Sequence, residues 1–242
     1  MVNAGVTVGL LFRTLEHFGD RISNVGLDLP ESGNGLPDPL NEVRNELEWL
    51  FKMQLYDGRV SHKLSAITFD YRDVPETDPD RRYFCPWVTA ATADFTAMMA
   101  LGARHFRRWD PAFAGQCLAA ARKSWDCLCA NPDHVEPDQQ AFHTGGYGAG
   151  DKSHRLWAAV ELWETTGAPS FLEWFENRAG DCSFHRLGPV WYDVGDLALG
   201  AYLEASRPEP REASLVERFR ESLFVRARLD RRMNFLVPLE AA

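Results

Sequence analysis

The chain has 242 residues, of which 45% are hydrophobic and 25% are charged, and its formal net charge is −9. These proportions predict a soluble globular domain with enough apolar side chains for a sizeable core. The acidic balance argues against nucleic acid or an anionic membrane as the main partner. Eight Trp and fifteen Phe exceed what such a core needs, and this surplus mildly favours a carbohydrate ligand, because sugar rings stack on aromatic faces.

The N-terminus and the cysteines give no sign of export, a membrane span or a metal. Residues 1–20 lack a basic region ahead of their apolar run, so we expect no signal peptide and leave the localisation open. No stretch approaches the roughly 18 apolar residues of a membrane helix. The odd number of cysteines and their irregular spacing are typical of buried free thiols. We expect no metal and no cofactor.

Helical patterns dominate the chain. Asp38 ahead of Pro39 predicts an N-terminal cap for one of these helices. Residues 58–69 alternate in polarity and predict a short hairpin. Apolar residues recurring at spacings of three and four predict helices over residues 2–18, 37–54, 89–107, 111–130, 153–165, 170–177, 194–205 and 213–228.

Two predicted loops are long, residues 19–37 and 131–152. Long loops of an all-helical protein normally gather at one end of the helices, where a site would be built. The helices come in successive pairs, which favours a bundle or a toroid of helical hairpins. No linker divides the chain, so we expect one all-α domain over residues 1–242.

Two aspartates three residues apart, Asp193 and Asp196 in "WYDVGD", allow two interpretations. They could be a pair of catalytic carboxylates, one acting as general acid and the other as general base. They could also mark the start of a helix, where negative charge is favoured by the helix dipole.

Four stretches in register resemble one known family: "PESGNGLPDPLNEVRNELEWLFKMQ" from residue 30, "DGRVSHKL" from 57, "TAATADFTAMMALGARHF" from 89 and "HTGGYGAGDKSHRLWAAVELWETTG" from 143. Together they are similar to glycoside hydrolase family nine, the inverting β-glucanases whose catalytic domain is an (α/α)6 barrel. The resemblance extends over roughly the first 170 residues. It implies hydrolysis of O-glycosyl bonds in β-1,4-glucans of the cellulose type.

The family's catalytic residues have no counterpart in the chain. Its aspartates lie in a Gly-Trp-x-Asp-Ala-Gly-Asp motif that precedes a helix resembling residues 2–18, and its catalytic Glu follows a His-x-Arg segment near the C-terminus. The resemblance therefore implies an incomplete (α/α)6 barrel with no catalytic residue of its own, inactive when alone. The same register places "WYDVGD" at a family helix, which favours the helix-start interpretation of Asp193 and Asp196.

Candidate sugar-binding residues follow from the resemblance. His62 matches the family's His-Lys segment beside the cleft and could bind sugar hydroxyls, or it could be a structural histidine. Tyr83 and Trp87 could stack on a sugar, although core packing is the more frequent role of such aromatics. His143 and His154, on either side of "TGGYGAGD", are expected to be solvated loop residues.

The loop between these histidines departs from the family pattern. Gly146 and Ala149 stand where the family often has the Glu and Asp that bind calcium, a cation that requires several oxygen ligands. Asp151 by itself would be a poor site. We therefore expect no calcium here and a looser loop.

The leading hypothesis is a β-1,4-glucan hydrolase that acts on β-glucan or cello-oligosaccharide, with no nucleic-acid or membrane partner. A non-catalytic glucan-binding or degenerate scaffold protein is the alternative. A different α/α toroid that shares only the helical periodicity is a third. Because the resemblance implies absent neighbouring helices, apolar faces would be exposed, and we expect the chain to aggregate or fold poorly when expressed alone.

Overall fold

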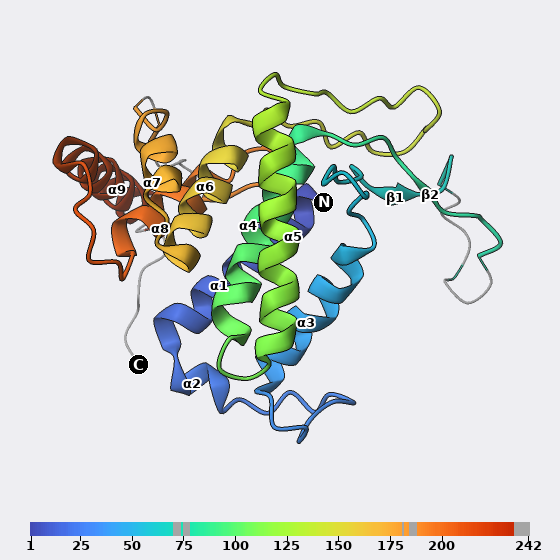
Figure 1. The fold of residues 1–242 in the computed structure, drawn as a ribbon, viewed down its shortest axis with the longest axis horizontal. Coiled ribbons are helices and arrows are strands. Elements are labelled where there is room, and N and C mark those ends of the chain that lie inside the picture. Colours follow the sequence, from blue (N-terminus) through green and yellow to red (C-terminus); the bar gives the residue numbers. More distant parts are fainter. Residues whose placement is uncertain (70–73, 75–77, 181, 184–187, 235–242) are drawn as a thin grey trace.

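Helices make up most of the molecule (Figure 1), which confirms the all-α expectation. The computed structural model describes residues 1–69, 74, 78–180, 182–183 and 188–234. The described helices are α1 (Val2–Phe18), α2 (Asp20–Ser23), α3 (Asp38–Phe51), α4 (Thr89–Phe106), α5 (Pro111–Ala130), α6 (Lys152–Thr166), α7 (Pro169–Glu176), α8 (Gly195–Glu204) and α9 (Ala213–Asn234). Strands β1 (Leu64–Ser65) and β2 (Tyr83–Phe84) form an antiparallel pair.

Helix α4 lies at the centre of the fold and is buried along nearly its whole length. It packs against α1, α3, α5 and α6. Ala and Thr supply half of its residues, and these small side chains let neighbouring helices approach from every side. The Thr92 and Thr96 hydroxyls donate to carbonyls four residues earlier, at 2.8 Å each, so these polar groups are satisfied inside the core.

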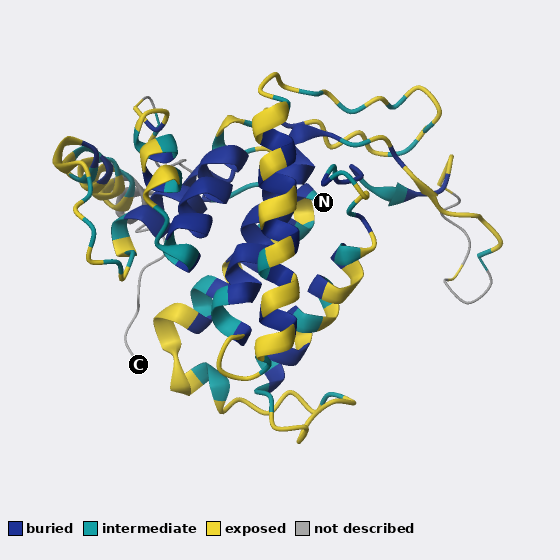
Figure 2. Cartoon of the chain, viewed as in Figure 1, coloured by how far each residue is buried: buried dark blue, intermediate teal, exposed yellow. Residues whose placement is uncertain are grey.

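The helices form an inner and an outer layer. The inner helices α6 and α8 are almost entirely buried like α4, and they pack on one another. The outer helix α5 is buried on one side and exposed on the other, as Figure 2 shows. Successive inner and outer helices thus pair as hairpins, as the sequence predicted. None of the described helices has the length and apolar character needed to cross a membrane.

Helix α1 differs from the other inner helices because it is buried on one face only. Leu10, Leu11 and Phe18 lie on its opposite face with 46%, 39% and 55% of their surface exposed. An inner helix of this kind presents an apolar stripe to solvent.

The two long loops lie at opposite ends of the helices (Figure 1), so the expectation that they gather at one end is wrong. The first loop follows the inner helix α1, and the second follows the outer helix α5. Inner and outer helices run in opposite directions, which places their C-terminal ends at opposite ends of the fold. Only the second loop, over residues 131–151, lies beside β1 and β2.

Asp38 does not cap α3, contrary to the sequence expectation. Pro37 is the N-cap residue, Asp38 begins the helix, and no side-chain cap is formed. The Asp38 carboxylate instead accepts hydrogen bonds from the Leu27 amide (2.9 Å) and the Ser32 hydroxyl (2.7 Å). Asp38 therefore fixes the preceding loop against the helix.

The alternating stretch at residues 58–69 is extended, but its strand partner is distant in sequence. In the β1–β2 pair, Leu64 lies opposite Phe84 and Ser65 opposite Tyr83. An isolated bridge between Gln54 and Val60 closes a local turn. The expectation of a self-contained hairpin is thus only partly confirmed.

None of the five cysteines, all of them among the described residues, forms a disulfide. Cys85, Cys117 and Cys127 are buried as expected, whereas Cys129 is exposed and Cys182 is half-buried.

Replacement of Gly58 by Ala should destabilise the fold strongly. Gly58 has φ +90°, and a Cβ there would lie 2.3 Å from the Lys123 carbonyl oxygen. We expect the free energy of unfolding to fall by at least about 2 kcal/mol. Gly115, on α5 with open space around it, is the matched control, and Gly115→Ala should stabilise by about 0.5–1 kcal/mol. Urea unfolding of both variants checks this, and equal effects would contradict the packing described.

The exposed stripe of α1 should make the isolated 242-residue chain self-associate. We expect oligomers by light scattering and binding of a hydrophobic dye. The double variant Leu10→Glu/Phe18→Glu should shift the chain toward monomer, whereas Val25→Glu, at an exposed loop position, should not. A monomeric parent chain with a sharp, reversible thermal transition would contradict this prediction.

Candidate functional site

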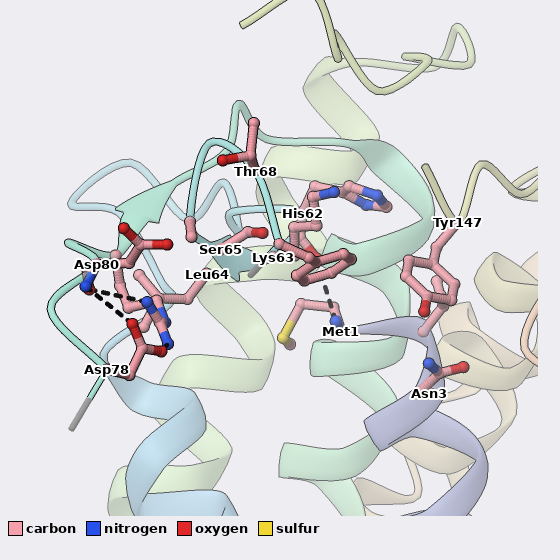
Figure 3. A pocket seen from close by; sticks show the side chains of 14 residues that line it. Met1, Asn3, His62, Lys63, Leu64, Ser65, Thr68, Asp78, Asp80 and Tyr147 are labelled. Carbon is pink, nitrogen blue, oxygen red and sulfur yellow. Dashed lines mark hydrogen bonds and ion pairs between the residues drawn. The ribbon is translucent and has the colours of Figure 1, made fainter. Parts of the chain in front are cut away.

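A cavity of about 260 Å³ lies at the N-terminal end of α1, next to β1 (Figure 3). Figure 3 shows Asn3 and Tyr147 on one side, Asp78 and Asp80 on the other, and Lys63 between them. The described residues that line it are Met1, Val2, Asn3, His62, Lys63, Leu64, Ser65, Ala66, Thr68, Phe69, Asp78, Asp80, Arg82 and Tyr147.

His62 is part of the cavity wall, but it is only 2% exposed. Its Nε2 lies 2.6 Å from the Gly146 carbonyl oxygen. A carbonyl can only accept, so Nε2 carries the proton and Nδ1 is an acceptor. Nδ1 is buried with no hydrogen-bond partner among the described residues. His62 therefore forms a structural hydrogen bond with the loop at Gly146. It also lines the cavity, and its predicted contact with sugar stays a prediction.

The segment 143–146 is fastened to the residues around β1. The Lys63 ammonium donates to Thr144 Oγ1 at 2.8 Å and to the Gly145 carbonyl at 2.5 Å. The Ser65 hydroxyl lies 3.1 Å from Thr144 Oγ1. The His143 amide donates to the Ile67 carbonyl at 2.7 Å.

Tyr83 and Trp87 are not among the described residues that line the cavity. Tyr83 lies on β2 and is 45% exposed, so it is not a core residue. Trp87 is half-buried, and the Arg59 guanidinium lies 5.6 Å from its ring centre. Their predicted contact with sugar therefore stays a prediction.

Tyr147 is a cavity residue that the sequence analysis missed. Its ring packs edge-on against Trp191 at 5.7 Å between centroids, and Trp191 packs edge-on against Tyr192 at 5.1 Å. The signal available in the sequence was an aromatic residue between glycines of the long loop. Tyr147 gives the cavity an aromatic wall opposite its acidic side.

The acidic side of the cavity is partly neutralised. Asp78 forms an ion pair with Arg82, and the hydrogen bond from Arg82 holds the pKa of Asp78 below its ordinary value. A carboxylate kept ionised in this way is a poor general acid, because it holds no proton to donate.

Asp193 and Asp196 lie at the start of α8, as the helix-start interpretation expected. Asp193 Oδ1 accepts the Gly195 amide at 2.9 Å, and Gly195 is the first residue of the helix. Asp196 is in the first turn and forms an ion pair with Arg226. Neither is among the described residues that line the cavity.

His154 is not a solvated loop residue, so that expectation is wrong. Helix α6 begins at Lys152, which places His154 in its first turn, facing α4. His154 and Asp94 are both fully buried, with Nδ1 and Oδ1 2.6 Å apart. Burial alone would lower the pKa of His154, but the Asp94 carboxylate raises it above its ordinary value. His143, by contrast, is exposed as expected.

The sequence matches the family model of glycosyl hydrolase family 9 over residues 1–219. The chain belongs to this family. It is 44% identical to endoglucanase D of Acetivibrio thermocellus, over 92% of the chain and 36% of that protein. It is 31% identical to a xyloglucan-specific endo-β-1,4-glucanase of Bacteroides ovatus, over 92% of the chain and 39% of that protein.

Solved structures of family 9 have the same fold. A metagenome-derived endoglucanase, 34% identical, superposes with a TM-score of 0.84 over 94% of the chain and 41% of that structure. The helical hairpins described above are thus part of an (α/α)6 barrel, as the resemblance implied. The chain spans less than half the length of the family 9 proteins it matches here.

The residues of the 146–151 segment do not fit the calcium ion that the resemblance associates with this loop. The Gly146 carbonyl accepts from His62, Ala149 is buried, and Asp151 forms an ion pair with Arg155 at 2.7 Å. Among the described residues, no cluster of three or more His, Cys, Asp or Glu side chains could hold a metal. The sequence analysis expected a looser loop because calcium would be absent. In the structure, hydrogen bonds from Lys63 and His62 hold residues 144–146 of this loop in place.

The His62 imidazole should remain neutral into mildly acidic solution. Burial lowers its pKa below the ordinary value of 6.5, although the bond to Gly146 acts in the opposite sense. The unfolded chain then binds more protons than the folded one, so His62 reduces stability as the pH falls from about 6.5 toward the lowered pKa.

An NMR titration of the ring nitrogens, assigned with His62→Gln, should show a midpoint below 6.5 and the proton on Nε2. A midpoint at or above 6.5, or the other tautomer, would contradict the environment described.

Proposed function

We propose that the chain is part of a β-1,4-glucan hydrolase and that the cavity beside α1 binds a cello-oligosaccharide. The observation that carries this is that the Tyr147 ring forms an aromatic wall of the cavity, with the Asn3 amide on the same side and the Asp78 and Asp80 carboxylates on the other. A β-linked glucose unit has apolar faces and a hydroxyl-bearing edge. An aromatic wall beside fixed polar groups suits both.

The names of the two relatives agree with this proposal, since each is a glucanase. One of them is described as specific for xyloglucan, which is a β-1,4-glucan carrying side chains. The cavity is open toward the exposed Tyr147 and Phe69, so we include both plain and branched glucans as candidate ligands.

Catalysis would require more than the described cavity residues offer. An inverting glycosidase uses a carboxylate base and a carboxylic acid roughly 6.5–9.5 Å apart. The carboxylates on the described cavity wall are Asp78 and Asp80, and Asp78 is held ionised by Arg82. We therefore propose that these residues bind glucan and leave the acid–base pair to residues outside this set. A non-catalytic glucan-binding protein would use the same cavity.

Binding of cellohexaose by the 242-residue chain, measured by calorimetry, tests the proposal. Tyr147→Ala should weaken binding about tenfold, which corresponds to about 1.4 kcal/mol. Tyr56→Ala is the control, because Tyr56 is 87% exposed and does not line the cavity. A parallel titration with a xyloglucan oligosaccharide measures whether the cavity prefers glucans that carry sugar branches. No binding of either sugar, or equal effects of the two variants, would overturn the proposal.

Hydrolysis of carboxymethylcellulose and of a chromogenic cellobioside should stay at background for this chain. Asp193→Ala and Asp196→Ala should bind cellohexaose as the parent does, because both carboxylates belong to the start of α8. Turnover that disappears in either variant would show that the "WYDVGD" pair is catalytic after all.

A further inference from the structure

Tyr147 occupies an unusual backbone conformation. Its φ is +51°, in the left-handed region that residues with a bulky side chain rarely adopt. A Cβ on Gly145 would lie 2.7 Å from Tyr147 Cε2, because the ring folds back over the Gly145 backbone. Such a conformation costs of order 1–3 kcal/mol. It persists only where the surrounding structure holds it.

The contacts that hold it come from Lys63, which lies between the two sides of the cavity. Lys63 Nζ binds two successive residues of the loop, the Thr144 hydroxyl at 2.8 Å and the Gly145 carbonyl at 2.5 Å. An ammonium has three N–H donors and can therefore gather two oxygens at once. The Phe142 ring lies 5.7 Å from Nζ and adds a favourable contact with the cation.

The next peptide is fixed as well, since the Gly146 carbonyl accepts from His62. Adjacent residues His62 and Lys63 thus hold three consecutive residues of the loop, and Tyr147 follows directly. The ring then meets Trp191 edge-on. This chain of contacts connects β1 to the aromatic wall of the cavity.

We propose that Lys63 is a positioning residue: its ammonium gathers the Thr144 and Gly145 oxygens and so presents the Tyr147 ring to the bound glucan. Only the glucan-affinity part of this inference rests on the proposed function. The ordering of the loop by Lys63 does not depend on any ligand.

Lys63 also lines the cavity and could instead contact sugar directly, so the experiment separates the two roles. The first measurement needs no ligand. The His143 amide is hydrogen-bonded to Ile67, and its hydrogen exchange reports whether the loop stays in place. We expect exchange at least tenfold faster in Lys63→Ala than in the parent, and unchanged in Lys52→Ala, a control at an exposed lysine.

Chemical rescue sharpens this measurement. In Lys63→Ala, added n-propylammonium can supply the missing part of the side chain together with its N–H donors. It should restore slow exchange at His143, whereas n-propanol should not. If Lys63→Ala fails to fold, Thr144→Val removes the same contact from the loop side and should also accelerate exchange. Exchange that remains slow in the folded variants would overturn the proposal, whatever the glucan affinity.

A double-mutant cycle with cellohexaose addresses the affinity. Lys63→Ala and Tyr147→Ala should each weaken binding about tenfold, and the double variant should be no weaker than either single one, because Lys63 acts through Tyr147. Losses that multiply to about a hundredfold would assign Lys63 a direct contact and overturn the positioning role. If the parent chain binds no cellohexaose, the proposed function fails, and the exchange measurement alone decides for or against Lys63.

Discussion

The burial of α4 along nearly its whole length is the constraint on which the rest of the fold depends. A helix surrounded on every side by other helices must have small side chains where its neighbours come closest. At Gly102, for example, a Cβ would lie 2.7 Å from Leu47 Cδ1. Any ionised group inside must also be paired. Asp94 is paired with His154 across α4 and α6, and near the other end Arg104 Nη2 lies 2.9 Å from Glu161 Oε2. These two polar contacts fix how α6 sits on α4.

The cavity lies where the N-terminal end of α1 meets segments that are not helical. Helix α1 brings Asn3, β1 and its neighbours bring His62 and Lys63, and the 131–151 loop brings Tyr147. Each element therefore contributes a different kind of group. Side-chain contacts from His62 and Lys63 to backbone carbonyls hold the loop. The contacts that hold the loop in place are therefore polar, whereas the Tyr147 ring that lines the cavity is aromatic.

Periodicity was sufficient to predict the longer helices, because each has apolar residues that recur on a buried face, whereas the four-residue α2 (Asp20–Ser23) lies within the stretch predicted to be a loop. Features that depend on tertiary partners could not be read in this way. Nothing local shows that Ser65 pairs with Tyr83, or that Asp38 binds the loop before it and leaves the helix uncapped. His154 was misassigned because a buried histidine requires a partner on another helix, and Asp94 is 60 residues away. Tyr147 was missed because its importance comes from a backbone conformation that a sequence does not display.

The loop after α1 has a practical consequence for work on this protein. It lies at the opposite end of the helices from the cavity (Figure 1). Its Gly26 has nothing within 4 Å of a Cβ built there and lies outside the left-handed region, whereas Gly33 and Gly35, with φ of +88° and +91°, would be strained by any side chain. A fluorophore or surface linker attached to a cysteine introduced by Gly26→Cys would occupy open space. The molecule could then be anchored to a support in one orientation, with the cavity beside α1 directed toward solution.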